Sequence, residues 1–183
     1  VPGEAKAGEY FLCAGRLVAY KRIDLAVRVC SEMSLPLIVA GDGGELKRLK
    51  SMAGPTVEFR GRVSNDELLK LYQDCRAFIF PGEEDFGITP LEAQACGRPV
   101  IAYGRGGALE TVVDGQTGLF FDQQDKEPLK LALKRFRDCE AAFDPTVIRQ
   151  HAEGFSVDRF LREFGRMVKE FYEEFRTRQE MLR

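Results

Sequence analysis

Two glutamates, Glu84 and Glu92, flank a predicted helix start in the middle of the chain, with seven residues between them. The apolar run 77–80 precedes them and predicts a buried strand. Thr89 is a good N-cap, Pro90 suits the first helical position, and Glu92 then falls where a capping box places an acid. Amide N–H groups at such a helix start bind anions, and carboxylates bind hydroxyls. The stretch therefore predicts a site for a ligand that carries phosphates and hydroxyls, such as a sugar nucleotide.

Both glutamates also have an explanation that needs no ligand. Glu92 could serve only as the acid of a capping box that begins at Thr89. Glu84 belongs to the run 82–85 of glycine and acids, which could equally be a solvated loop.

Two cations, Arg16 and Lys21, follow the first predicted strand. Together with a helix N-terminus, two such cations can neutralise a pyrophosphate leaving group without a metal. The alternative is that they are ordinary surface charges. If the functional interpretation is correct, both must lie at the same edge of the molecule as Glu84.

Apolar runs alternate with amphipathic stretches along the chain, which is typical of a parallel sheet with helices on both faces. The predicted strands are 10–14, 36–40, 57–59, 77–80, 99–103 and 118–121, and the last predicted helices are 127–142, 145–151 and 156–178. We therefore predict one α/β domain over residues 1–183, with a doubly wound, Rossmann-like parallel sheet of about six strands. A helical C-terminal extension begins at about residue 123. Ligands of such sheets bind at the carboxyl ends of the strands.

Other chemistries find less support. The loops 41–44 and 104–107 are rich in glycine, and each could admit a ligand or simply make a tight turn. The chain has neither a G-x-G-x-x-G nor a P-loop motif, which disfavours nicotinamide cofactors and P-loop chemistry. No D-x-D pair occurs, which argues against a carboxylate-bound metal, and the single histidine, His151, is expected to be structural.

Composition narrows the class of protein further. The net charge of −2 gives no reason to expect nucleic acid, and no signal peptide or membrane-length apolar run is recognisable. The five cysteines are scattered without a C-x-x-C, which favours reduced thiols in the core and a cytoplasmic location. The chain opens without a methionine, as a piece of a longer protein would.

Four segments together resemble the nucleotide-sugar-binding C-terminal domain of the retaining GT-B glycosyltransferases of family 4, also called group 1. They are GRLVAYKRIDLAVRV, GDGGELKRL, VEFRGRVSNDELLKLYQDCRAFIFP and EDFGITPLEAQACGRPVIAYGRGGALETVVDGQTG. The similarity runs from about Phe11 to Gly118, with a matching helical tail. The segment EDFGITPLEA looks most like the corresponding segment of bacterial and archaeal mannosyltransferases.

The resemblance implies a role for each matching residue. Arg16 and Lys21 would bind the donor diphosphate, and Glu84 and Glu92, the two acids of the E-x7-E motif, would contact the donor hexose and the ribose. The remaining donor-binding positions implied are Gly15, Gly61, Arg62, Val63, Phe86, Gly87, Ile88 and Thr89. Among these, the loop 61–63 would border the nucleobase, and the amides of 87–89 would surround the sugar and phosphates. Asp85 departs from the family pattern, in which glycine is commoner at this position of the loop that would contact the donor sugar.

The expected function is therefore donor binding in a metal-independent, retaining mannosyltransferase that uses GDP-mannose and a glycan or lipid acceptor. No cofactor is implied. Such enzymes have an N-terminal acceptor-binding domain that this sequence does not include, so we expect donor recognition without normal turnover, and peripheral membrane association only for a full enzyme. Two alternatives stay open: a non-catalytic sugar-nucleotide-binding module, or another GT-B enzyme such as an epimerase or a UDP- or ADP-glucose-using synthase.

Overall fold

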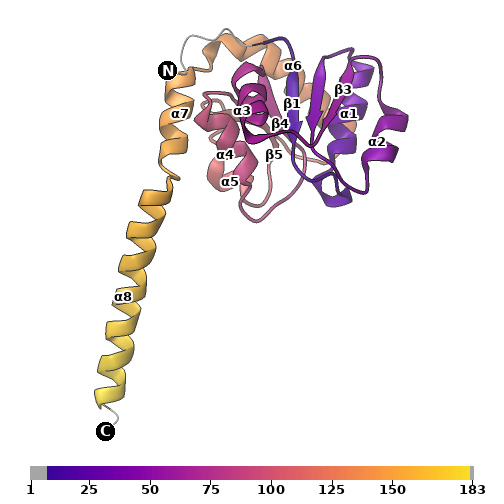
Figure 1. Cartoon of the computed structure of the whole chain (residues 1–183). Coiled ribbons are helices and arrows are strands. Elements are labelled where there is room, and N and C mark those ends of the chain that lie inside the picture. Colours follow the sequence, from indigo (N-terminus) through magenta and orange to yellow (C-terminus); the bar gives the residue numbers. More distant parts are fainter. Residues whose placement is uncertain (1–7, 182–183) are drawn as a thin grey trace. The chain divides into compact units, whose positions relative to one another are not determined.

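The computed structural model describes residues 8–181 and shows a parallel sheet with helices on both faces (Figure 1). Within these residues the strands are β1 (Phe11–Ala14), β2 (Leu37–Ala40), β3 (Val57–Gly61), β4 (Ala77–Phe80), β5 (Val100–Tyr103) and β6 (Gly118–Phe121). Their order in the sheet is β3-β2-β1-β4-β5-β6, and all neighbouring pairs are parallel. This order confirms the predicted doubly wound, Rossmann-like fold.

The strands are short apolar runs because the sheet is covered on both faces. Every residue of β1, β2 and β4 is buried. The edge strand β3 differs, since Glu58 and Arg60 alternate with partly buried residues and are exposed. Charged side chains on an edge strand discourage pairing with another chain.

Each face of the sheet has its own helices. The helices α1 (Ile23–Glu32), α2 (Leu46–Met52) and α6 (Lys126–Cys139) pack in one apolar cluster. The second cluster involves α3 (Asn65–Asp74), α4 (Ile88–Ala95) and α5 (Ala108–Thr111). The strands supply alternate side chains to the two clusters, for example Phe11 to the first and Leu12 to the second.

A capping box forms at the start of α3. The Ser64 hydroxyl accepts from the Glu67 N–H, and the Glu67 carboxylate accepts from the Ser64 N–H. The capping box predicted from Thr89 to Glu92 is wrong.

The structure begins α4 at Ile88, with Gly87 as N-cap at φ 82° and no side-chain cap. Thr89 and Pro90 are thus the second and third helical residues. Proline is tolerated there because the first N–H groups of a helix have no intrahelical partner. The Glu92 carboxylate instead accepts a hydrogen bond from the Tyr72 hydroxyl.

The C-terminal part is helical, as predicted. After α6 come a 3₁₀ turn (Glu140–Ala142), α7 (Pro145–Glu153) and α8 (Val157–Met181). The chain divides into two compact units, one ending at Ala152 and the other beginning at Glu153. Taken by itself, the second unit is an amphipathic helix whose exposed apolar side chains include Phe160, Phe164, Phe171 and Phe175. Among the residues that the structure describes, no helix has an apolar stretch of the length needed to span a bilayer.

All five cysteines are free thiols. Cys13, Cys30 and Cys75 are buried in the two apolar clusters, and the other two are partly exposed. The predicted use of thiols as small core residues is confirmed for these three.

Candidate functional site

The order of the strands places a crevice between β1 and β4. These strands are neighbours in the sheet, yet α1, which follows β1, packs on one face and α4, which follows β4, packs on the other. The two connections therefore diverge at the carboxyl edge and leave room for a ligand between them.

The first of two hollows at this edge lies over the ends of β1, β2 and β3. This β1–β3 hollow has a volume of 490 Å³. Its lining includes Gly15, Arg16, Gly41, Asp42, Gly43, Arg62, Val63 and Leu68. Four predicted residues, Gly15, Arg16, Arg62 and Val63, thus come together here, whereas Gly61 is not among the lining residues. Asp42 comes from the glycine-rich loop 41–44, whereas Leu68 is an addition that the sequence did not suggest.

The second hollow lies at the N-terminus of α4. This α4 hollow has a volume of 620 Å³ and is lined by Tyr20, Lys21, Glu83, Glu84, Asp85, Phe86, Gly87, Ile88 and Thr89. Six of these residues were predicted from the sequence: Lys21, Glu84, Phe86, Gly87, Ile88 and Thr89. Tyr20, which the sequence analysis did not single out, adds an aromatic side chain that is 60% exposed.

Lys21 and Glu84 form an ion pair across the crevice. The Lys21 ammonium donates to Glu84 Oε1, and the two side chains are only 16% and 20% exposed. Both residues also line a small cavity shared with Ala14, which in turn lines the β1–β3 hollow. The ion pair therefore stands at the junction of the two hollows. The predicted meeting of Lys21 and Glu84 is what the structure shows.

Glycines allow the loops of the site to approach one another closely. A Cβ on Gly82 would lie 2.8 Å from the Lys21 Cα, and a Cβ on Gly107 would lie 2.4 Å from the Phe86 Cα. A Cβ on Gly41 would lie 1.9 Å from the Gly15 carbonyl oxygen. A Cβ at any of these distances would clash with the neighbouring backbone, so these positions require glycine. The two glycine-rich loops thus pack against neighbouring loops of the site.

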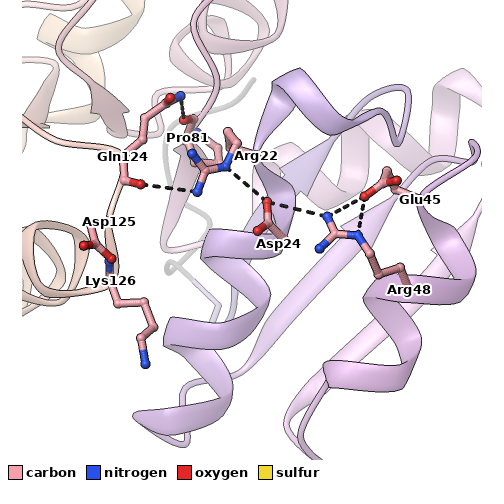
Figure 2. Close-up of polar contacts among 8 residues, drawn as sticks. All are labelled: Arg22, Asp24, Glu45, Arg48, Pro81, Gln124, Asp125 and Lys126. Carbon is pink, nitrogen blue, oxygen red and sulfur yellow. Dashed lines mark hydrogen bonds and ion pairs between the residues drawn. The ribbon is translucent and has the colours of Figure 1, made fainter.

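A polar network joins the segments next to Lys21 and Glu84, and Figure 2 shows this network from Arg22 to Gln124 and Pro81. The Gln124 side chain donates to the Pro81 carbonyl at 2.8 Å, and the Gln124 carbonyl accepts from Arg22 Nη2 at 3.2 Å. Arg22 also contacts Asp24 at 3.4 Å and adopts a left-handed conformation, with φ 50° and ψ 31°. Since Arg22 follows Lys21 and Pro81 begins the loop of Glu84, this network positions both partners of the ion pair.

Glu92 lies one helical turn beyond the N-terminus of α4 and is not among the residues lining either hollow. Its Oε2 atom accepts a hydrogen bond of 2.9 Å from the hydroxyl of Tyr72 on α3. Burial, and then the nearby Glu92 carboxylate, raise the pKa of Tyr72, so the phenol stays protonated and acts as the donor. This contact could not be predicted from the sequence, because Tyr72 is one of several apolar residues at helical spacing.

The acids of the site form no recognisable metal centre. Among residues 8–181, no three His, Cys, Asp or Glu side chains are grouped so that they could hold a metal ion. His151, on α7, lies 3.1 Å from the Thr111 carbonyl oxygen, a structural contact outside both hollows.

The fold is a Rossmann-like domain of the GT-B type, and the crevice lies at its topological switch point. Residues 1–153 match the family model described as glycosyl transferases group 1, and the chain belongs to that family.

The proteins that are similar in sequence are named for more than one activity. The chain is 33% identical over 139 residues to a GDP-mannose-dependent alpha-mannosyltransferase of Corynebacterium glutamicum, covering 71% of this chain and 33% of the relative. It is also 33% identical over 147 residues to a D-inositol 3-phosphate glycosyltransferase of Acidothermus cellulolyticus, covering 69% of this chain and 33% of that relative. The chain thus spans about a third of the length of these relatives.

Solved structures agree on the fold. A sucrose-phosphate synthase from Thermosynechococcus elongatus matches with a TM-score of 0.81 at 25% identity, over 91% of this chain and 46% of that one. Anabaena Alr3699/HepE in complex with UDP and glucose matches with a TM-score of 0.78 at 21% identity, over 88% and 48%.

Proposed function

We propose that this chain is the donor-binding domain of a retaining, metal-independent glycosyltransferase, and that its donor is GDP-mannose. The observation that carries the proposal is the ion pair of Lys21 and Glu84 beside the N-terminus of α4. A cation, a carboxylate and free helix amides at one point suit a ligand in which a diphosphate is joined to a hexose.

The two hollows divide the donor between them. The nucleobase occupies the β1–β3 hollow beside Arg62 and Val63, with Arg16 directed toward the diphosphate. The hexose occupies the α4 hollow, where Glu84 accepts from its hydroxyls. Lys21 and the amides of residues 87–89 stabilise the charge of the departing nucleoside diphosphate, which is how such a site accelerates transfer without forming a covalent intermediate on the protein.

The choice of GDP-mannose rests on the relatives. Several are named as GDP-mannose-dependent mannosyltransferases, and one of these, from Mycolicibacterium smegmatis, is named for a phosphatidylinositol monomannoside acceptor. Others are named D-inositol 3-phosphate glycosyltransferases. For this protein we therefore propose a glycan or lipid acceptor, held by a further part of a longer cytoplasmic enzyme.

Calorimetric titration of the chain with GDP-mannose, UDP-glucose and ADP-glucose tests the proposal directly. We expect GDP-mannose to bind most tightly, with the same affinity in the presence of EDTA. Tighter binding of UDP-glucose would overturn the choice of donor, and a loss of affinity in EDTA would overturn metal independence. If none of the three binds, the function itself is wrong.

Lys21→Ala tests the observation on which the proposal rests. Charge-assisted hydrogen bonds contribute about 1.5–3 kcal/mol, so the variant should bind GDP roughly tenfold or more weakly. Lys47→Ala is the matched control, because Lys47 is an exposed lysine on α2 that lines neither hollow. If the two variants bind GDP with equal affinity, Lys21 does not take part in nucleotide binding.

A further inference from the structure

Tyr72 is a buried residue of α3 whose hydroxyl reaches a carboxylate on another helix. Only 2% of Tyr72 is exposed, and its ring packs against Phe78 at 5.7 Å between centroids. The hydroxyl donates to Glu92 Oε2 on α4 at 2.9 Å. Because the ring is fixed by packing, the direction of this hydrogen bond is fixed as well.

The contact forms a junction between α3 and α4, and each of these helices supplies a lining residue to one of the two hollows. Leu68, one turn before Tyr72 on α3, lines the β1–β3 hollow. Thr89, three residues before Glu92 on α4, lines the α4 hollow. A nucleotide that extends from one hollow to the other places its ribose between base and diphosphate, next to this junction.

We propose that Tyr72 is a positioning residue for Glu92, holding Oε2 so that Oε1 accepts from the ribose hydroxyls of the bound nucleotide. The inference rests on the proposed function, which places a nucleotide across the crevice. Glu92 itself is exposed and has three rotatable bonds. Without an anchor, ordering its side chain on binding would cost conformational entropy that offsets much of the hydrogen bond.

A preference for ribose over deoxyribose reports on this contact specifically. A purely structural brace between α3 and α4 would, when removed, lower stability and weaken all nucleotides equally. A positioning residue instead affects only those ligands that have the hydroxyl which Glu92 binds. The ratio of affinities for GDP and 2′-deoxy-GDP separates these cases, and UDP with 2′-deoxy-UDP serves as a second pair of probes.

We expect the unaltered chain to bind GDP roughly tenfold more tightly than 2′-deoxy-GDP, as a charge-assisted hydrogen bond implies. In Tyr72→Phe the preference should fall to about threefold or less, while affinity for 2′-deoxy-GDP is retained, which also shows that the variant is folded. In Glu92→Gln the preference should fall as far, and adding Tyr72→Phe to it should change the preference no further.

Tyr10→Phe is the matched control. The Tyr10 hydroxyl donates to the Leu71 carbonyl on α3 at 3.0 Å, and not to Glu92. The substitution Tyr10→Phe therefore also removes one phenolic hydrogen bond to α3. The control should keep the full preference for ribose. If Tyr10→Phe narrows the preference as much as Tyr72→Phe, or if Tyr72→Phe leaves it unchanged, the inference is wrong.

The same titrations separate the failure of the inference from that of the proposed function. If the unaltered chain binds none of the nucleoside diphosphates, the proposed function fails and the inference falls with it. If it binds GDP and 2′-deoxy-GDP equally, donor binding stands, but the contact between Glu92 and the ribose, and with it the role of Tyr72, is overturned.

Discussion

Lys21 and Glu84 neutralise each other in the structure, although a nucleotide sugar would engage them separately. The ammonium suits the diphosphate, whereas the carboxylate suits the hexose and repels the phosphates. Binding of the donor must therefore exchange the ion pair for two new contacts. Because both side chains are mostly buried, neither can simply turn to solvent when that exchange takes place.

This exchange predicts opposite effects of Glu84→Gln on two ligands. Removing the charge frees Lys21 and ends the repulsion of the phosphates, so GDP should bind as tightly as before or more tightly. GDP-mannose loses its contact with the carboxylate, so its affinity relative to GDP should fall by roughly tenfold. Glu83→Gln is the control, since Glu83 lines the same hollow but is exposed. Parallel losses for both ligands in Glu84→Gln, measured by calorimetry, would contradict this account.

Arg22 shows how the site constrains a single backbone position. A non-glycine residue at φ 50° is strained, and here the contacts with Gln124 and Asp24 compensate. Arg22→Ala keeps the strain and loses the contacts, whereas Arg22→Gly loses the contacts and relieves the strain. We expect the glycine variant to be more stable than the alanine variant by about 1 kcal/mol in denaturant unfolding. The reverse order would mean that the backbone here is not strained.

Side chains that carry charge were easier to predict from the sequence than their anchors. Glu84 and Lys21 were found because charged residues after a buried strand are conspicuous. Tyr72 was missed because a tyrosine at helical spacing is typical of a core face. The Thr89 cap was predicted wrongly, since the local pattern matched a capping box while the left-handed Gly87 had already started the helix. The role of Tyr72 depends on a contact with Glu92, 20 residues away in the sequence, which a local pattern does not show.

At the scale of elements, the loop 104–107 supports the loop of Glu84. The Gly107 N–H donates to the Glu84 carbonyl at 2.8 Å, and Gly106 also lies against that carbonyl. The connection after β5 therefore stabilises the loop of Glu84 by packing and hydrogen bonding to its backbone. The glycines of the loop 104–107 allow its backbone to pack directly against the loop of Glu84.

Gly107→Ala should therefore lower both the stability of the protein and its affinity for the donor, although Gly107 lines neither hollow. Its Cβ would lie 2.5 Å from the Phe86 carbonyl oxygen, so the loop must shift, at a cost of about 1–3 kcal/mol in the free energy of unfolding. Affinity for the hexose part of the donor should fall as well. Gly44→Ala is the control, because no atom lies within 4 Å of the Cβ it would add. Its stability should change by no more than about 0.5 kcal/mol. Similar losses in both variants would argue against a specific loop contact.

The elements themselves were largely predictable. Each predicted strand is present, with ends that differ by no more than two residues, because apolar runs of this length between turn signals have few other uses. The parallel, doubly wound sheet followed from the alternation of strands and helices, whereas the order of the strands was not predicted. The geometry of the loops did not follow, since it depends on backbone contacts such as those of Gly41 and Gly82.

For the whole molecule, the buried thiols make the free energy of unfolding depend on pH in the alkaline range. Burial raises the pKa of Cys30 and of Cys75 from 9.0 to about 12, and these residues lie on opposite faces of the sheet. Between these values the unfolded chain loses the thiol protons while the folded chain keeps them. The folded state then binds more protons, so the free energy of unfolding must fall as pH rises.

We therefore expect full stability below pH 9 and a progressive loss from pH 9 toward pH 12, by up to about 1.4 kcal/mol per pH unit for each thiol. Denaturant unfolding at a series of pH values measures this slope. Cys30→Ala and Cys75→Ala should each be less stable at neutral pH, because each leaves a cavity, but each should lose less stability in the alkaline range. If the slope is the same in the single variants and the unaltered chain, groups other than these two thiols control alkaline unfolding.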